Sequence, residues 1–325
     1  MIKLAIVGYG NLGKGVELAV RQNPDMELAA VFTRRDPKSL QVQTPGLQVL
    51  AMEQLDSMAE QLDVLILCGG SATDLPEMTP ALAKKCNVVD SFDNHSRIPE
   101  HIARVDAAAK AAGKMALVSC GWDPGMFSLA RIYAQAALPS GESYTFWGPG
   151  LSQGHSEAIR RIPGVVDARQ YTVPVEAALE QVRSGEAPRL TTRQKHTRHC
   201  YVVAEDGADR EEITRTICQM PGYFADYDTT VNFITREELA RNHSTMPHGG
   251  FVIRSGVTAE NVRHTIEYSL KLESNPQFTA SILVSCARAA VRMQARGETG
   301  CATIAEIRPC DLLMDSVEEI RAHMI

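Results

Sequence analysis

Long apolar runs are missing from this sequence of 325 residues, and none approaches the ~20 residues that a transmembrane helix needs. The first residues also lack the charged segment, apolar stretch and small-residue cleavage site of a secretory signal. Positive charge is not in excess, because the formal net charge is −6. A mildly acidic chain disfavours general binding to nucleic acid or to membrane surfaces. We therefore expect a cytoplasmic protein with no nucleic-acid or membrane partner.

Cysteine pairs in the C-x-x-C pattern are absent too. The eight cysteines lie mostly in apolar segments, which is typical of reduced core thiols in a cytoplasmic protein. A chain of this length buries roughly 75% of its unfolded surface, so it needs neither disulfide bonds nor a structural metal. We expect no metal site. The sequence has no internal repeat, and its length favours about two domains.

Strand and helix signals alternate through about the first 120 residues. Strand-like segments occupy residues 2–7, 28–32, 64–68, 88–89 and 115–118. Helical character runs over residues 11–22 and again around 98–109, where apolar residues recur every three or four positions and Gly113 is placed to end the helix. Strands separated by helices form a parallel sheet that binds ligands at the carboxyl ends of its strands. The first domain is therefore predicted to be α/β and of the Rossmann type.

The pattern changes after Gly121. Turn signals at residues 122–125 and 148–150 precede strand-like segments at 171–173 and 200–203. Asp209 and Glu212 have capping-box spacing, a long helix is predicted over residues 279–295, and Ser316 opens a short last helix. We expect a second, α+β domain over residues 121–296. The first domain then comprises residues 1–120, with a C-terminal segment from about 297 to 325 returning to it.

A glycine-rich motif follows the first strand. Residues 7–13 read Val-Gly-Tyr-Gly-Asn-Leu-Gly, match G-x-G-x-x-G and open a predicted helix. In that setting the glycines permit a tight turn, close approach of the backbone to a pyrophosphate, and close packing of helix on strand. The helix N-terminus adds unpaired N–H groups and a partial positive charge. We therefore predict a dinucleotide site rather than a simple glycine turn.

The end of the second strand selects the cofactor. NAD enzymes place an acid there, whereas this chain has Thr33, Arg34 and Arg35. A hydroxyl and two arginines suit a 2′-phosphate, which arginine binds in bidentate fashion. The residues predict NADP, the alternative being a solvated pair of surface arginines. The small residues at 68–73 end another strand beside the same crevice and suit the pyrophosphate or the nicotinamide ribose, although an ordinary turn has the same composition.

Longer stretches are more specific than this fingerprint. Besides residues 7–13 and 33–35, they are 70–74, 93–95, 121–127, 145–155, 160–165, 246–250 and 275–280. In these stretches the sequence closely resembles the meso-diaminopimelate dehydrogenases, the NADP-dependent enzymes of bacterial lysine biosynthesis, and the resemblance covers nearly the whole chain. The block around Trp147 is the most specific part. The weakest stretches are 36–60, 180–192, 205–219, 255–263 and the C-terminal residues.

The resemblance implies a reaction and an assembly. The D-configured centre of meso-diaminopimelate loses hydride to NADP⁺, and hydrolysis of the resulting imine gives L-2-amino-6-oxopimelate and ammonia. The reverse direction is a reductive amination. The family also implies a homodimer, with the second domain binding substrate and forming the dimer.

The resemblance also assigns residues. Asp93 and Asp123 are the expected catalytic residues, because a carboxylate near the nicotinamide can pair with the reacting ammonium and help it lose a proton. The expected substrate contacts are Asp93, Asp123, Trp147, Gln153, Gly154, Thr172, Arg198, His248 and Asn275. The expected cofactor contacts are Tyr9, Gly10, Asn11, Leu12, Thr33, Arg34, Arg35, Cys68, Gly69, Gly70, Ser71, Ser91, Phe92, Asp93, Cys120, Gly121, Trp122, Asp123 and Pro124.

Structural explanations exist for several of these residues. Asp93 fits an Asx-turn, Asp123 a turn acid before Pro-Gly, and Trp147 a core residue. The basic run at residues 193–199 fits a solvated face, and its two histidines with Cys200 lack the rest of a metal ligand set. Thr172, Arg198, His248 and Asn275 instead form a donor-rich set that fits the far, L-configured end of the substrate.

Two other functions remain as alternatives. The first is a related NADP reductase, such as a semialdehyde dehydrogenase that uses Cys120 as a nucleophile. A small buried residue is the competing interpretation of Cys120, and no histidine base is assignable to it. The second is a non-catalytic sensor that binds NADPH without turnover. Dependence of NADPH oxidation on ammonia separates the dehydrogenase from both.

Overall fold

A computed structural model describes all 325 residues, which form two compact units. Unit 1 comprises residues 1–129 and 276–325, and unit 2 comprises residues 130–275. The return to unit 1 therefore begins at Pro276, earlier than the expected position near residue 297, and unit 2 begins at Ala130 rather than at Gly121. The reason is that the long helix over 275–295 packs on the first sheet, so it contributes to the core of unit 1.

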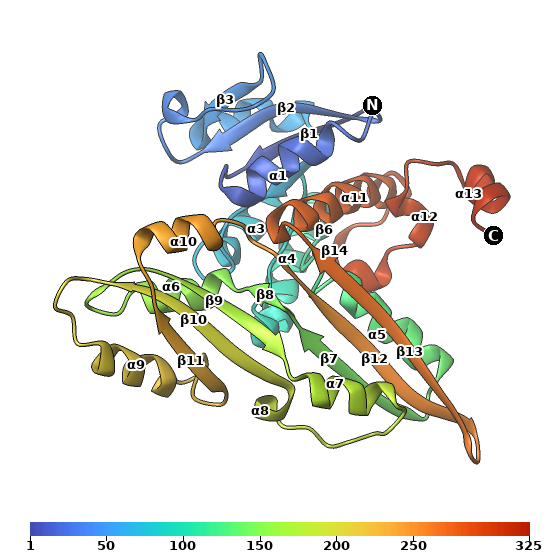
Figure 1. Cartoon of the computed structure of the whole chain (residues 1–325). Coiled ribbons are helices and arrows are strands. Elements are labelled where there is room, and N and C mark those ends of the chain that lie inside the picture. The colour runs from blue at the N-terminus through green and yellow to red at the C-terminus, as the bar shows by residue number, and fades with distance from the viewer. The chain divides into compact units, whose positions relative to one another are not determined.

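Unit 1 is built on one parallel sheet of seven strands in the order β14-β6-β5-β4-β1-β2-β3 (Figure 1). Its strands are β1 (Ile2–Val7), β2 (Met26–Thr33), β3 (Gln48–Ala51), β4 (Val64–Leu67), β5 (Asn87–Asp90), β6 (Met115–Leu117) and β14 (Gly300–Ala302). Its helices are α1 (Asn11–Val20), α2 (Leu55–Met58), α3 (Leu75–Leu82), α4 (Ile98–Ala112), α12 (Pro309–Leu312) and α13 (Val317–His323), and α11 (Asn275–Ala295) lies almost wholly in this unit.

Both faces of this sheet are covered, as a parallel sheet requires. Leu4 and Ile6 of β1 face a core shared with α1 and α11, whereas Ala5 and Val7 face a second core shared with α3 and α4. The α/β prediction is confirmed. Gly113 ends α4 in the left-handed region at φ +64°, as expected for a C-terminal glycine.

Unit 2 contains two further sheets. A four-stranded sheet has the order β11-β10-β9-β8, from Asp228–Phe233, His196–Ala204, Val165–Pro174 and Gly150–Leu151. A three-stranded sheet has the order β13-β12-β7, from Val262–Leu272, His248–Ala259 and Gly141–Trp147. The helices of unit 2 are α6 (Gln153–Arg160), α7 (Glu176–Arg183), α8 (Thr192–Lys195), α9 (Arg210–Gln219) and α10 (Arg236–Asn242). Helix α5 (Met126–Ala137) begins in unit 1 and ends in unit 2.

The predicted strands and the helix after Asp209 are present in unit 2, and the structure adds several elements that the sequence analysis did not predict, among them β7, β11, α7 and α10. Asp209 caps α9 by accepting from the N–H groups of Glu211 and Glu212, as its spacing predicted. The long hairpin of β12 and β13, visible at the lower right of Figure 1, was not predicted. The sequence of β13 does alternate, with Ile266, Tyr268, Leu270 and Leu272 separated by polar residues, so the strand signal was present although most of the strand is exposed. No helix of the structure is both long and apolar enough to cross a membrane.

Candidate functional site

The glycine-rich turn after β1 has the geometry that its motif predicted. Gly8 adopts φ +94°, and a Cβ at Gly13 would lie 2.3 Å from the carbonyl oxygen of Gly8, so neither position accepts a side chain. Gly10 precedes α1, and a Cβ there would meet nothing within 4 Å. The turn is therefore tight, and its outer side is open to a ligand at the N-terminus of α1.

The turn lies at the point in the sheet where successive strands change direction of addition. From β1 the chain adds β2 on one side, and it later adds β4 on the other side. A cleft of about 230 Å³ opens at these strand ends, and it is lined by Val7, Gly8, Tyr9, Phe32, Thr33, Arg34, Arg35, Met52, Cys68, Gly69, Asp74 and Met78. Dinucleotides bind at such a reversal point in sheets of this kind. Of the expected cofactor contacts, the cleft brings together Tyr9, Thr33, Arg34, Arg35, Cys68 and Gly69.

The two arginines after β2 lie at the rim of this cleft. The Arg34 side chain is 67% exposed, and its Nη2 donates to Asp74 Oδ1 over 2.6 Å. Arg35 Nη2 donates to the carbonyl oxygen of Tyr9 over 2.6 Å, and its backbone N–H donates to Thr33 Oγ1 over 3.0 Å. Arg35 is therefore held at the glycine-rich turn and Arg34 at the loop after β4, so both guanidinium groups are placed at the rim of the cleft.

Asp74 was not singled out from the sequence. Its Oδ2 accepts from the N–H of Gly70 over 2.9 Å, and that bond, together with Arg34, holds the pKa of the carboxyl below its ordinary value. Asp74 therefore orders the loop after β4 and orients Arg34 at the same time. Its signal in the sequence was its place at the end of the 70–74 stretch, directly before α3.

The loops after β5 and β6 carry the expected catalytic residues of unit 1. Asp93 N–H donates to Ser71 Oγ over 3.1 Å, which joins the loop after β5 to the loop after β4. Asp123 and Trp122 lie in the loop between β6 and α5, where the indole of Trp122 packs edge-on against Phe127 at 5.3 Å. Both carboxylates thus follow strands of the parallel sheet at its ligand-binding edge.

Cys120 is fully buried in this region. A side-chain hydrogen bond with Cys286 and desolvation raise the pKa of its thiol well above the ordinary value. A nucleophilic cysteine needs a thiolate, so these surroundings oppose the role that a semialdehyde dehydrogenase would require. Phe92 is also buried, with its ring stacked on His101, so only its backbone faces the loop surface.

Unit 2 holds the remaining expected substrate residues. Thr172 on β9 and Arg198 on β10 are directly paired in register, and an Arg198 Nη1–H donates to Thr172 Oγ1. The Arg198 guanidinium lies 3.9 Å from the centre of the Tyr227 ring. Arg198 is only 6% exposed, and its Nε–H is buried without a hydrogen-bond partner in the chain. The solvated basic face considered for this run is therefore wrong at Arg198, although Arg193, on α8, is exposed and pairs with Asp228.

The loop that follows Trp147 packs on the Thr172–Arg198 pair. A Cβ at Gly148 would lie 2.0 Å from the carbonyl oxygen of Thr172, and a Cβ at Gly150 would lie 2.4 Å from the His248 ring. These contacts require glycine, and they place the Trp147 loop beside both Thr172 and His248. Two further expected residues, Gln153 and Asn275, are both hydrogen-bonded to Met246. The Met246 sulfur accepts from Gln153 Nε2 over 3.1 Å, and the Met246 carbonyl accepts from Asn275 N–H over 3.0 Å. Gly154 follows Gln153 in the first turn of α6.

His196 was considered as part of the basic run and turns out to support Trp147. Its Nε2 accepts from the backbone N–H of Trp147 over 2.8 Å, and the two rings stack at 5.4 Å. Burial lowers the pKa of His196 to about 3, so the ring is neutral and able to accept this bond. No group of three or more histidine, cysteine or acidic side chains is arranged to hold a metal ion.

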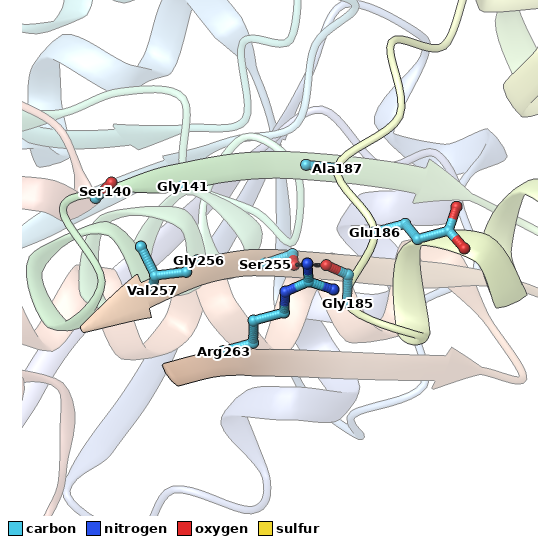
Figure 2. Close-up of a pocket in the computed structure, with 9 residues that line it drawn as sticks. All are labelled: Ser140, Gly141, Gly185, Glu186, Ala187, Ser255, Gly256, Val257 and Arg263. Atoms are coloured by element: carbon cyan, nitrogen blue, oxygen red, sulfur yellow. Dashed lines mark hydrogen bonds between the residues drawn. The ribbon is translucent and has the colours of Figure 1, made fainter. Parts of the chain in front are cut away.

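A separate pocket of about 390 Å³ lies at the end of the three-stranded sheet (Figure 2). It is lined by Ser140, Gly141, Gly185, Glu186, Ala187, Ser255, Gly256, Val257 and Arg263, none of which is an expected site residue. Its charged groups, Glu186 and Arg263, are exposed, and Ser255 is already bonded to the carbonyl oxygen of Gly185 over 3.0 Å. The pocket therefore offers no buried unpaired group with which to recognise a ligand.

Comparison with known proteins gives a consistent result. Residues 121–274 match the family model described as the diaminopimelic acid dehydrogenase C-terminal domain. The chain is 56% identical to the meso-diaminopimelate D-dehydrogenase of Acetivibrio thermocellus over 100% of this chain and 98% of that protein.

Solved structures agree with this match. A sixfold-substituted variant of the Clostridium tetani meso-diaminopimelate dehydrogenase, determined with diaminopimelate, is similar at a TM-score of 0.95 and 49% identity, with 100% of both chains covered. An engineered D-amino acid dehydrogenase bound to NADP⁺ is similar at a TM-score of 0.89 and 47% identity, covering 100% of this chain and 99% of that one.

Proposed function

The chain belongs to the meso-diaminopimelate dehydrogenase family, and we propose that it catalyses the NADP-dependent oxidative deamination of the D-centre of meso-diaminopimelate. The products are L-2-amino-6-oxopimelate and ammonia, and the reverse reaction is a reductive amination that serves lysine biosynthesis. NADP⁺ supplies the hydride acceptor. The residues of the cleft in unit 1 fit this cofactor, because Arg34 and Arg35 take the place of the acid that an NAD enzyme carries.

The observation that carries the substrate assignment is Arg198. A buried arginine whose Nε–H lacks a partner in the chain suits an anionic ligand, because an unpaired buried donor is costly. Carboxylates are the anions of an amino acid, and the planar guanidinium binds them in bidentate fashion. Thr172, which is bonded to Arg198, and the expected substrate residues His248 and Asn275 would add the donors and acceptors that suit the ammonium and carboxylate of the L-configured end.

The positions substituted in the Clostridium tetani variant coincide with the same set. Its six substitutions replace a glutamine, a threonine, an arginine, a proline, a histidine and an asparagine. The same residue types recur here in the same order and at the same spacing as Gln153, Thr172, Arg198, Pro247, His248 and Asn275. Pro247 is the member that was not singled out from the sequence, since a proline offers no side-chain donor or acceptor.

We assign the chemical step to Asp93 and Asp123 of unit 1. A carboxylate that accepts a hydrogen bond from the reacting ammonium holds the Cα–H in a fixed orientation and favours loss of the ammonium proton before hydride transfer. Two anchored ends also define the stereochemistry. When the L-configured end occupies the Arg198 site, only the opposite, D-configured centre is left for the nicotinamide.

The test is the initial rate of NADPH formation, followed at 340 nm, with meso-diaminopimelate, its LL isomer and a panel of simple D-amino acids. We expect turnover of the meso isomer alone. Turnover across the panel would show that the distal anchors are permissive and would change the assignment to a broad D-amino acid dehydrogenase. Tight NADPH binding without any turnover would support a reductase or a sensor instead.

We also propose that the protein is a cytoplasmic homodimer. All eight cysteines are unpaired thiols, which suits a reducing compartment. In unit 2, Ile132 and Tyr133 on α5 are 46% and 56% exposed, and Val262 and Ile266 on β13 are 45% and 36% exposed. Ile266 on β13 lies directly opposite Arg254 on β12, so their side chains share one face of the sheet. The Arg254 side chain donates to the carbonyl oxygens of Leu138 and Pro139, which directly follow α5. The end of α5 therefore lies on the sheet face that carries Ile266. An apolar surface of this kind suits burial against a second copy.

The oligomeric state tests this proposal. Light scattering after size exclusion should give twice the chain mass of 35.5 kDa, and the pair Ile132→Glu and Ile266→Glu should shift the protein toward monomer. Val317 on α13 is similarly exposed at 42% but lies in unit 1, so Val317→Glu is the matched control and should stay dimeric. A wild-type monomer would contradict the proposal.

A further inference from the structure

Unit 1 contains a buried aspartate–histidine pair outside the expected catalytic set. Asp90, the last residue of β5, is fully buried, and His101 on α4 is 4% exposed. Asp90 Oδ1 accepts from the N–H groups of Phe92 and Ser119, each over 3.0 Å. Its Oδ2 accepts from Thr79 Oγ1 over 2.7 Å and lies 2.8 Å from His101 Nε2. Four groups from four parts of the unit therefore converge on one carboxylate.

Two of those groups belong to the loops that carry the expected catalytic residues. Phe92 immediately precedes Asp93, and Ser119 opens the loop that leads to Asp123. The carbonyl oxygen of Asp90 also accepts from the N–H of Cys120 over 2.9 Å. One residue at the end of β5 thus fixes the start of the loop after β5 and the start of the loop after β6.

The backbone at Ser119 shows how closely this loop is held. Ser119 adopts φ +57°, in the left-handed region that residues other than glycine rarely occupy. Such a conformation is unfavourable and persists only where surrounding contacts impose it. The hydrogen bond from its N–H to Asp90 is one of those contacts. His101 contributes on the other side, because its ring stacks on Phe92 at 4.2 Å with an interplanar angle of 16°.

We propose that Asp90 is a positioning residue that keeps the backbones at Asp93 and Asp123 in a fixed mutual arrangement. The proposal rests on the proposed function for the role of those two carboxylates. A carboxylate has about four acceptor positions, and Asp90 uses all of them when His101 donates from Nε2. An asparagine of the same shape lacks the carboxylate charge and keeps all four partners only by donating from its N–H₂ group to Thr79 and to the other tautomer of His101, so its bonds to the N–H groups of Phe92 and Ser119 are weaker.

The experiment compares Asp90→Asn with Asp311→Asn. Asp311 is a matched control because it is also buried in unit 1 and hydrogen-bonded, to Arg296 and Arg308, but it lies in the C-terminal segment away from these loops. Both variants should lower Tm. Only Asp90→Asn should lower kcat, by roughly 10- to 100-fold, because displacement of a reacting group by about 1 Å has effects of that size. The Kd for NADPH should rise by a smaller factor than kcat falls, because Arg34, Arg35 and the glycine-rich turn are untouched and only the contacts from the loops after β5 and β6 shift.

Hydrogen exchange provides a readout that does not depend on turnover. Peptides covering residues 91–97 and 118–125 should exchange faster in Asp90→Asn and at the wild-type rate in Asp311→Asn. His101→Gln retains a side-chain N–H donor and should recover most of kcat relative to His101→Ala. An Asp90→Asn enzyme with normal kcat and only a lower Tm would overturn the positioning role. Loss of the proposed function would appear differently, as a wild-type protein with no turnover of meso-diaminopimelate but with faster exchange in both loops of Asp90→Asn.

Discussion

The two arginine sites of this protein are built in opposite ways. In unit 1, Arg34 is 67% exposed and paired with Asp74 at the rim of the nucleotide cleft. In unit 2, Arg198 is 6% exposed, packs on Tyr227 and has no carboxylate partner in the chain. Exposed charges interact weakly through water, whereas a buried charge interacts strongly and depends on its partners. We therefore expect the cofactor phosphate to be recognised by a modest surface interaction, and the substrate by a stronger buried one.

The largest effect should follow loss of the buried site. Arg198→Met keeps most of the side-chain volume but removes the guanidinium that we assign to the substrate carboxylate. We expect kcat/KM for meso-diaminopimelate to fall by about 100-fold, mostly through KM, because charge-assisted hydrogen bonds in a buried site contribute roughly 2–3 kcal/mol. Steady-state kinetics measures the change in kcat/KM and KM. The Kd for NADP⁺, measured alongside, should not change. Arg193→Met, at an exposed arginine of the same run, is the control, and an unchanged KM in Arg198→Met would remove the anchor role.

The exposed pair should matter less and in a more selective way. Arg34→Ala combined with Arg35→Ala should weaken NADP⁺ binding by roughly 30-fold and change NAD⁺ binding by less than about twofold, since only NADP⁺ carries the 2′-phosphate. Calorimetry with both cofactors measures the difference. Lys38→Ala, which removes an exposed charge from the same loop, should leave both affinities near wild type. Equal losses for the two cofactors would refute the 2′-phosphate assignment.

The units should also differ in their response to acid. Burial lowers the pKa of His155 to about 4 and that of His196 to about 3, and both residues lie in unit 2. Their unfolded pKa is about 6.5, so the unfolded chain binds more protons below that pH, and stability falls as the pH drops from about 6.5 toward 4. Each histidine should contribute roughly 1–2 kcal/mol of destabilisation at pH 5 relative to pH 7.5.

Urea unfolding at the two pH values, with hydrogen exchange to locate the change, measures this effect. Amides of unit 2 should lose protection first. The pKa values of some carboxyl groups in unit 1, such as those of Asp25 and Asp74, are lowered. These groups reduce the stability of the fold only once the pH falls below their ordinary pKa of 3.8. His196→Gln should make the pH dependence shallower. Loss of protection that begins in unit 1 between pH 6.5 and 5 would contradict this comparison.

The smallest expected effect concerns salt. Raising NaCl from about 0.05 to 0.5 M shortens the Debye length from roughly 14 to 4 Å, which screens exposed charges far more than buried ones. The preference for NADP⁺ over NAD⁺ should therefore fall by about threefold, while KM for meso-diaminopimelate changes little. Binding titrations and kinetics across the salt series test the difference. A substrate KM more sensitive to salt than cofactor preference would mean that Arg198 is reached by solvent ions.

The sequence predicted unit 1 better than unit 2, and the reason is local. The glycine-rich motif after β1, the arginines after β2 and the glycine after α4 each report a backbone requirement within a few residues of themselves. Several elements of unit 2 were missed, among them the β12–β13 hairpin, even though β13 alternates apolar and polar residues. Asp74 was missed for a different reason, since its partners Arg34 and Gly70 are found only when separate loops meet.

By itself, the sequence determined that unit 1 is a parallel α/β sheet with a dinucleotide turn, because strand period, helix period and glycine positions are short-range properties. Only the tertiary structure decided which members of the basic run are buried. Arg193 and Arg198 are five positions apart in one run, yet α8 leaves the first in solvent and β10 places the second against Thr172 and Tyr227. Burial depends on what packs against a residue from elsewhere in the chain, so the residue's own neighbours in sequence do not determine it.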